Sequence, residues 1–362
     1  MKLGIVGLPN VGKSTLFNAI TKAGAMSANY PFCTIEPNVG VVDVYDPRLK
    51  VLGDMYHTQK ITPAQIEFVD IAGLVKGASE GAGLGNKFLS HIKEVDAIIH
   101  VVRCFKNEKI IHVDGSVDPI RDIETINLEL ILADIETVEK RLAKVDKLVH
   151  GGDASATKEK ELLDKIYSTL TKQQPARVLK FNEDEQKIVN SFFLITTKPI
   201  IYVGNTSETL DDYQKENLKK IQEIANEEHA GMMHLCAKIE EELVSLPDEE
   251  RQIFMEELGI DHSGLDNLIN ASYKLLGLIS FLTAGEKEVR AWTIKRGTLA
   301  PQAAGKIHTD FERGFIRAEI VKYADLVACG DYQMARAQGK IISAGKDYEM
   351  QDGDIVVFKF NV

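Results

Sequence analysis

The chain has 362 residues, of which 44% are hydrophobic, and a formal net charge of −11. This length exceeds what one hydrophobic core usually supports, so two or three domains are expected. The acidic balance argues against a surface built throughout for nucleic acid, although the near-neutral residues 286–362 could still present a basic face to RNA. The four cysteines form no C-x-x-C pair, which disfavours a disulfide framework or a zinc cluster.

The apolar segments of the chain are short. No stretch approaches the roughly 20 apolar residues that a transmembrane helix needs. The chain also does not open with a charged segment followed by a long apolar run, as a secretory signal would. We therefore expect a cytoplasmic protein that is neither secreted nor inserted in a membrane.

The first predicted elements enclose a phosphate-binding loop. Residues 7–14 read GLPNVGKS, which fits the pattern G-x-x-x-x-G-K-[ST], between an apolar run at 3–6 and a helix-like stretch at 15–21. The glycines let backbone N–H groups wrap the phosphates, Lys13 reaches the β and γ oxygens, and the Ser14 hydroxyl ligates magnesium. We predict a nucleoside triphosphate site with Lys13 in a catalytic role. Its members in this loop are Asn10, Val11, Gly12, Lys13, Ser14 and Thr15.

The next strand-like segments lie at 39–44 and 66–70, and the second ends in the sequence DIAG. This is the D-x-x-G position of a GTPase-like switch. Asp70 can hold the magnesium shell through water, and the Gly73 N–H can sense the γ-phosphate. Thr34 is the candidate switch threonine that reaches the magnesium, with a surface loop threonine as the alternative. The predicted metal set is Ser14, Thr34 and Asp70.

Two later strands end in motifs typical of base-binding loops. NTSE (205–208) follows the apolar run 199–204, and CAK (236–238) follows residues 233–235. A guanine-specific site uses Asn-Lys-x-Asp, but Thr206 and Glu208 replace the Lys and the Asp here. Losing paired hydrogen bonds to a buried base edge costs about 1–3 kcal/mol, so guanine selectivity should be lost. The predicted base-loop residues are Asn205, Glu208, Cys236, Ala237 and Lys238.

The hydrolytic machinery is incomplete. Leu74 stands where Ras-like proteins have the glutamine that orients the attacking water, so we expect slow turnover unless another group or a partner helps. His112 lies in the loop-like segment IIHVDGS, could swing toward the γ-phosphate, and is the catalytic candidate. For His91, on a predicted helix, a packed or surface histidine is the favoured interpretation. Asn10 could help to hold a potassium ion.

The region between the strands near residues 102 and 199 predicts a helical hairpin. Apolar residues recur there at alternating spacings of three and four, which is a heptad seam. They are Leu128, Ile131, Ile135, Val138, Leu142, Val145 and Val149. Residues 151–153 break the run, and a second amphipathic stretch at 162–170 can return antiparallel. We favour a seam that closes as core within a monomer, with dimerisation or a separate docking site as alternatives.

From about residue 278 the pattern changes to short alternating segments at 288–294, 314–321 and 355–360, with a helix near Phe311. This suits a small α+β domain. Basic and aromatic residues interleave in it and form a candidate RNA contact set, although the indole is more often core. The set is Trp292, Lys295, Arg296, Lys306, His308, Arg313 and Arg317.

The motifs GLPNVGKS, DIAGLVKGASEGAGLGNKF (70–88), NTSE and CAK together resemble the YchF-type Obg-like ATPases over essentially the whole chain. The resemblance implies an α/β fold: a doubly wound, mostly parallel P-loop NTPase sheet, an inserted antiparallel helical coiled-coil arm and a C-terminal β-grasp (TGS) domain. We place these parts at 1–122 with 197–277, at 123–196 and at 278–362. The resemblance also implies ATP with adenine bound through Asn205 and backbone groups, Mg²⁺, and the ribosome as partner.

Two classes of function fit these patterns. The first is a slow ATPase switch that acts with the ribosome or the translation machinery. The second is a nucleotide-stabilised module that binds RNA or the ribosome, in which hydrolysis is incidental. A conventional GTPase is a weaker alternative, disfavoured by Thr206 and Glu208. Activation of turnover by a partner would separate the first two.

Overall fold

The computed structural model describes residues 1–27, 39–71, 83–151, 153–258 and 263–361. The chain forms two compact units, one of Met1–Val41 with Glu67–Leu265 and one of Val42–Ile66 with Asp266–Val362. The predicted switch residues Thr34, Gly73 and Leu74 lie outside the described residues. Among the described helices, none combines the length and the apolar composition that a membrane crossing requires.

The first unit is built on a sheet with strand order β2-β4-β1-β5-β6-β7. The strands are β1 (Lys2–Val6), β2 (Val39–Asp43), β4 (Gln65–Asp70), β5 (Ala97–Arg103), β6 (Ile200–Asn205) and β7 (Gly231–Leu235). From β4 to β7 the neighbours pair in parallel. Every residue of β5 and β6 is buried, as expected for parallel strands covered on both faces. Because the carboxyl ends of parallel strands share one edge, the loops after β1, β6 and β7 come together.

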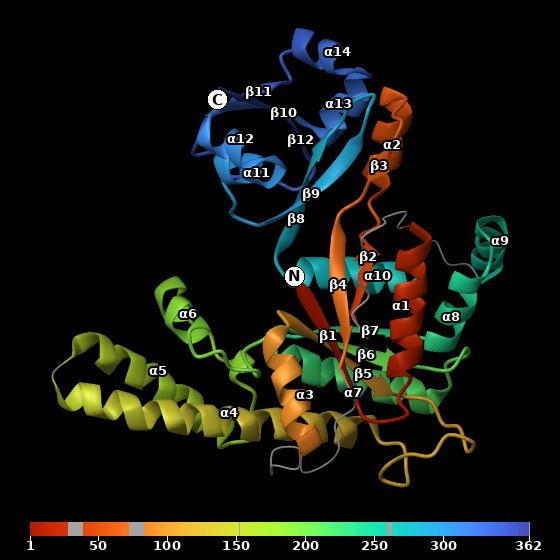
Figure 1. The fold of residues 1–362 in the computed structure, drawn as a ribbon. Coiled ribbons are helices and arrows are strands. Elements are labelled where there is room, and N and C mark those ends of the chain that lie inside the picture. Colours follow the sequence, from red (N-terminus) through yellow and green to blue (C-terminus); the bar gives the residue numbers. More distant parts are fainter. Residues whose placement is uncertain (28–38, 72–82, 152, 259–262, 362) are drawn as a thin grey trace. The chain divides into compact units, whose positions relative to one another are not determined.

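Helices connect these strands and follow the last of them (Figure 1). They are α1 (Lys13–Ser27), α3 (Gly83–Glu94), α4 (Pro119–His150), α5 (Ala154–Leu170), α6 (Glu183–Asn190), α7 (Asp212–Glu227), α8 (Ala237–Ser245) and α9 (Asp248–Leu258), with a 3-10 turn η2 (Ala176–Val178). The long helix α4 starts cleanly because the Asp118 carboxylate accepts from the backbone N–H of Arg121 and Pro119 occupies the first turn.

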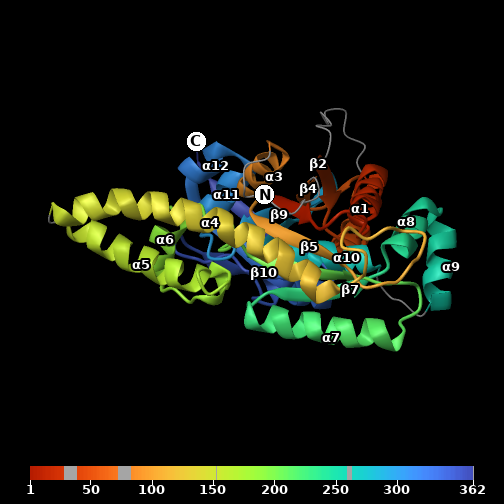
Figure 2. The same cartoon turned by 90° about the horizontal axis from the view of Figure 1, so that it is seen from below.

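The helices α4 and α5 form the predicted hairpin and run side by side in Figures 1 and 2. Asp153 caps α5 by accepting from the N–H groups of Ser155 and Ala156. The hairpin has its own buried apolar cluster, to which most of the predicted seam belongs. This cluster includes Ile131, Val138, Val145, Leu162, Leu163, Ile166 and Leu170, with Ile135, Leu142 and Val149 packed against it.

The seam prediction is wrong for Leu128, whose exposed fraction is 40%. The return helix α5 ends at Leu170, before it reaches this level of α4. Leu128 instead lines a cavity together with Gln173 and Pro175, which belong to the turn after α5. The apolar periodicity of α4 therefore continues beyond the region where a partner helix covers it.

The second unit contains a mixed sheet with strand order β11-β10-β12-β8-β9-β3. Its strands are β3 (Ile61–Thr62), β8 (Leu278–Thr283), β9 (Val289–Lys295), β10 (Phe315–Lys322), β11 (Ile342–Ala344) and β12 (Asp354–Phe360). Its helices are α2 (Pro47–Tyr56), α11 (Ala300–Ile307), α12 (Thr309–Arg313), α13 (Tyr323–Cys329) and α14 (Tyr332–Ala337), and α10 (Gly264–Leu275) begins at its boundary. β12 pairs with β8 in parallel, whereas β8 with β9 and β10 with both neighbours are antiparallel.

An aromatic cluster contributes to the core of the second unit. Phe281 is fully buried, contacts Phe358 edge-on at 5.8 Å and stacks on Trp292 at 6.2 Å. The indole packs against this core and donates its Nε1–H to the Thr283 hydroxyl, while the Arg290 guanidinium lies 4.0 Å from its ring centre. Trp292 therefore packs with the core, which was the favoured interpretation.

The structure adds detail to the predicted division of the chain. The predicted boundary at residue 122 falls inside the first turn of α4. Residues 42–66, which contain α2 and β3, belong with the C-terminal residues, and β3 extends the second sheet by pairing in parallel with β9. The three-domain division itself stays a proposal.

Candidate functional site

The phosphate loop has the backbone conformation that its sequence predicts. Asn10 and Gly12 both lie in the left-handed region, with φ of 63° and 93°. A Cβ on Gly12 would lie 2.1 Å from the Asn205 Nδ2 atom, so only glycine fits there. Helix α1 begins directly at Lys13, so its first-turn N–H groups lack helical partners and can bind an anion.

The structure brings Lys13 and Asp70 together although 57 residues separate them. The Lys13 ammonium donates to the Asp70 carboxylate at 3.2 Å and to the Ile71 carbonyl at 3.0 Å. The two side chains are only 10% and 17% exposed. Ser14 follows Lys13 in the chain and lies exposed in the first turn of α1. Carboxylate and hydroxyl oxygens are hard donors, so Asp70 and Ser14 fit the needs of a magnesium ion.

Asn205 ties the phosphate loop to the base loops. Its Nδ2 donates to the Val11 carbonyl at 2.8 Å, and its Oδ1 accepts from the Ala237 N–H at 3.0 Å. The residue is 4% exposed, so these bonds are shielded from water. An amide nitrogen has two hydrogens, and the second one can be offered to a base. Sequence reasoning predicted the base contact but missed this brace.

Most of the predicted nucleotide-binding residues line one cavity of about 710 Å³. A cavity of this size is typical of small-molecule sites. From the predicted set it contains Asn10, Gly12, Thr15, Asn205, Glu208, Cys236, Ala237 and Lys238. Two of these lining residues form an ion pair, in which the Glu208 carboxylate accepts from the Lys238 ammonium at 2.9 Å. This hydrogen bond raises the pKa of Lys238. Both side chains are more than half exposed.

One wall of the cavity was missed by sequence reasoning. Phe105, Lys106, Asn107 and Ile110, from the loop after β5, also line it. Arg103 shapes this loop by donating to three of its carbonyl oxygens, those of Phe105, Asn107 and Ile110, at 3.1–3.2 Å. The arginine is 1% exposed, and burial lowers its pKa. The only sequence signal was an arginine closing the apolar run AIIHVV.

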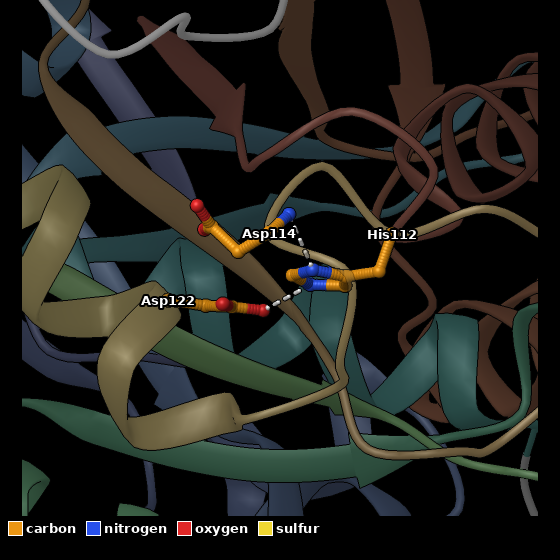
Figure 3. A group of neighbouring side chains, drawn as sticks. All are labelled: His112, Asp114 and Asp122. Atoms are coloured by element: carbon orange, nitrogen blue, oxygen red, sulfur yellow. Dashed lines mark hydrogen bonds and ion pairs between the residues drawn. The ribbon is translucent and has the colours of Figure 1, made fainter.

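His112 lies in a loop, as predicted, but its side chain is only 3% exposed. Its Nε2 is 2.9 Å from Asp122 Oδ2, and its Nδ1 accepts from the Asp114 backbone N–H at 3.1 Å (Figure 3). A neutral ring that accepts at Nδ1 carries its proton on Nε2, so the ring donates to Asp122. Burial raises the pKa of Asp122, while hydrogen bonds from His112 and Arg121 oppose the rise. Both ring nitrogens are thus engaged by other groups of the protein.

The other candidate, His91, lies exposed in the last turn of α3. Asn10 donates its Nδ2–H to the Ile111 carbonyl at 3.1 Å, which joins the phosphate loop to the loop that carries His112. A potassium contact of Asn10 stays a proposal.

Known proteins resemble this chain along its whole length. A family profile described as "50S ribosome-binding GTPase" matches residues 2–146, and YchF-GTPase_C, described as "Protein of unknown function (DUF933)", matches residues 278–361. A protein of Bacillus subtilis (strain 168) named "Ribosome-binding ATPase YchF" is 59% identical over 361 residues, which are 99% of each chain. The chain belongs to the YchF family.

Two further relatives agree with this membership. The protein of the same name from Escherichia coli O157:H7 is 51% identical over 362 residues, covering 100% of this chain and 99% of the other. A solved structure, "Structure of the Schizosaccharomyces pombe YchF GTPase", is 43% identical with a TM-score of 0.89 and covers 99% and 97% of the two chains. The family predicted from the motifs and the α/β fold class are therefore confirmed. In this YchF-family chain, the roles of the individual site residues stay predictions.

Proposed function

We propose that this YchF-family protein is a ribosome-binding ATPase that prefers ATP to GTP and hydrolyses it slowly. The observation that carries the proposal is the convergence of three separate motifs, GLPNVGKS, NTSE and CAK, on one cavity. Lys13, which pairs with Asp70, follows directly in the chain on Gly12 of the cavity lining. The names of relatives that are 51–59% identical over the whole chain support ATP as the substrate and the ribosome as the partner.

The phosphates of ATP would lie on the loop and the first turn of α1. There Lys13 exchanges its contact with Asp70 for the β and γ oxygens. Ser14, Asp70 through water, and Thr34 would hold Mg²⁺, which when bound neutralises charge on the phosphates. Gly73 would sense the γ-phosphate, and a K⁺ ion beside Asn10 belongs to the same proposal.

The preference for ATP rests on the base loops. A guanine site needs a short carboxylate that accepts from the guanine edge, whereas Glu208 is longer and is paired with Lys238. Adenine has an N1 acceptor and an N6 donor. The second amide hydrogen of Asn205 and backbone groups of the loop can serve these atoms. GTP would leave polar groups unpaired, which is the stronger form of discrimination.

Slow hydrolysis follows from two features. Leu74 cannot orient water, and His112, the catalytic candidate, has both ring nitrogens engaged. The engaged ring also favours the second candidate function, a nucleotide-stabilised module that binds the ribosome or RNA.

We further propose that the protein is a cytoplasmic monomer. Its C-terminal part is proposed to be a TGS-type β-grasp domain that contacts RNA together with the helical arm.

The test is ATP turnover measured with and without 70S ribosomes, at matched protein concentration. We expect slow turnover alone and at least a several-fold increase with ribosomes. Lys13→Ala serves as the control variant and should abolish both rates. Ribosome binding without any stimulation would reject the switch and favour the binding module.

A further inference from the structure

In the loop between β5 and α4, a polar side chain is buried while apolar neighbours are exposed. His112 is buried, while its apolar neighbours Ile111 and Val113 are 79% and 53% exposed. Because Ile111 and Val113 flank His112 in the chain, a displacement of this segment by one residue brings an apolar side chain to the buried position in place of the ring. Burial of apolar rather than polar side chains is the usual preference, and what reverses it here is the pairing of His112 with Asp122.

The loop joins two parts of the proposed switch. On one side the Ile111 carbonyl accepts from Asn10 of the phosphate loop. On the other side Asp122, only 2% exposed, belongs to the first turn of the arm helix α4. His112 stands between these contacts in the chain. A change at either end therefore acts on the pair of His112 and Asp122.

A metal ion is a poor alternative explanation of this cluster, although His112, Asp114 and Asp122 offer ligand atoms within 4.8 Å of one another. The guanidinium of Arg121 already lies 3.8 Å from the Asp114 carboxylate and 3.3 Å from that of Asp122. In Figure 3 the Asp114 carboxylate also points away from the ring, and its contact to His112 is made by the backbone.

We propose that Asp122 is a positioning residue that latches His112 in a resting state, and that a slip of the 111–113 segment exchanges the buried ring for an apolar neighbour. The released His112 is then free to reach the phosphates beside Asn10. This inference rests on the proposed function, a slow ATPase, with His112 as its catalytic candidate. It makes the arm helix a control element, because α4 carries the acceptor that holds the ring.

The first test removes the acceptor. Asp122→Ala leaves the buried Nε2–H of His112 unpaired, so we expect a several-fold rise in ribosome-free ATP turnover. Asp122→Asn keeps an acceptor oxygen and should stay close to the parent protein. A second readout is the rate at which diethyl pyrocarbonate modifies His112, measured by mass spectrometry. It should rise several-fold in Asp122→Ala, while exposed His308 reacts at an unchanged rate.

A second variant guards against misfolding of Asp122→Ala. Ile111→Ser changes an exposed side chain and leaves the carbonyl that binds Asn10 in place. If the slipped state buries Ile111, this variant should lower both turnover and His112 modification. Unchanged turnover and modification in both variants, or lower turnover in Asp122→Ala with normal ATP affinity, would overturn the latch.

The outcome for His112→Ala keeps the two proposals apart. If His112→Ala leaves turnover unchanged, the catalytic role of His112 fails and the latch has no function. If His112→Ala abolishes turnover while Asp122→Ala and Ile111→Ser behave like the parent protein, the latch alone fails. If the catalytic role of His112 and the latch by Asp122 are both correct, the double variant of His112→Ala with Asp122→Ala should be as inactive as His112→Ala.

Discussion

Replacing Asn205 tests how the cavity is held together. Asn205→Ala removes the bond to the Val11 carbonyl and the bond from the Ala237 N–H, at 2.8 and 3.0 Å. A buried hydrogen bond contributes about 1–1.5 kcal/mol, so the site loses about 2–3 kcal/mol of preorganisation. The Kd for an ATP analogue should therefore rise about 30- to 150-fold. Asn205→Asp should bind at least as weakly, because a carboxylate oxygen would face the Val11 carbonyl.

The assay is isothermal titration of each variant with a non-hydrolysable ATP analogue in the presence of Mg²⁺. Asn226→Ala is the matched control, since this asparagine is exposed on α7 and its side-chain oxygen accepts from Gln222. Circular dichroism should show that all variants are folded. If Asn205→Ala binds within about threefold of the parent protein, the brace between the loops does not organise the site.

Two further predictions concern stability. His100 is 1% exposed in β5, and burial with the nearby Arg177 charge lowers its pKa to about 3. Below pH 6.5 the unfolded chain takes up a proton that the folded chain excludes, so stability should fall by about 2 kcal/mol between pH 6.5 and 5 from this group. His100→Leu should lose that part of the pH dependence in urea unfolding; an unchanged pH dependence would contradict the burial of a neutral ring. In the hairpin, Leu163→Ala should cost about 2–5 kcal/mol and Leu128→Ala about 0.5 kcal/mol, and equal shifts in melting temperature would contradict the core assignment.

Features written in local patterns could be predicted from the sequence. The phosphate loop, the strands β1, β4, β6 and β7 that precede the motifs, and both helices of the hairpin all follow from short apolar runs, periodicity and turn residues. The order of motifs was enough to predict that their loops converge, because parallel strands share an edge. The cavity contains these loops as predicted.

Features that depend on distant residues could not be predicted. His112 was placed in a loop by its turn residues, but its burial depends on Asp122, on the next helix. The pairing of Arg48 with Asp352 joins residues 304 positions apart, and no periodicity links them. Arg103 donates to backbone carbonyl oxygens, whose positions depend on the path of the loop, and the sequence does not predict that path. Leu128 fits the heptad pattern perfectly, yet α5 is too short to cover it.

The most direct test of the proposed function is a side-by-side titration of the Mg²⁺-bearing, nucleotide-free protein with non-hydrolysable ATP and GTP analogues. The structure pairs Glu208 with Lys238, and the proposed function gives adenine to Asn205 and the loop backbone. We predict at least about tenfold tighter binding of the ATP analogue, which corresponds to about 1.4 kcal/mol. Equal affinities, or a preference for the GTP analogue, would contradict the assignment as an ATPase and favour a conventional GTPase.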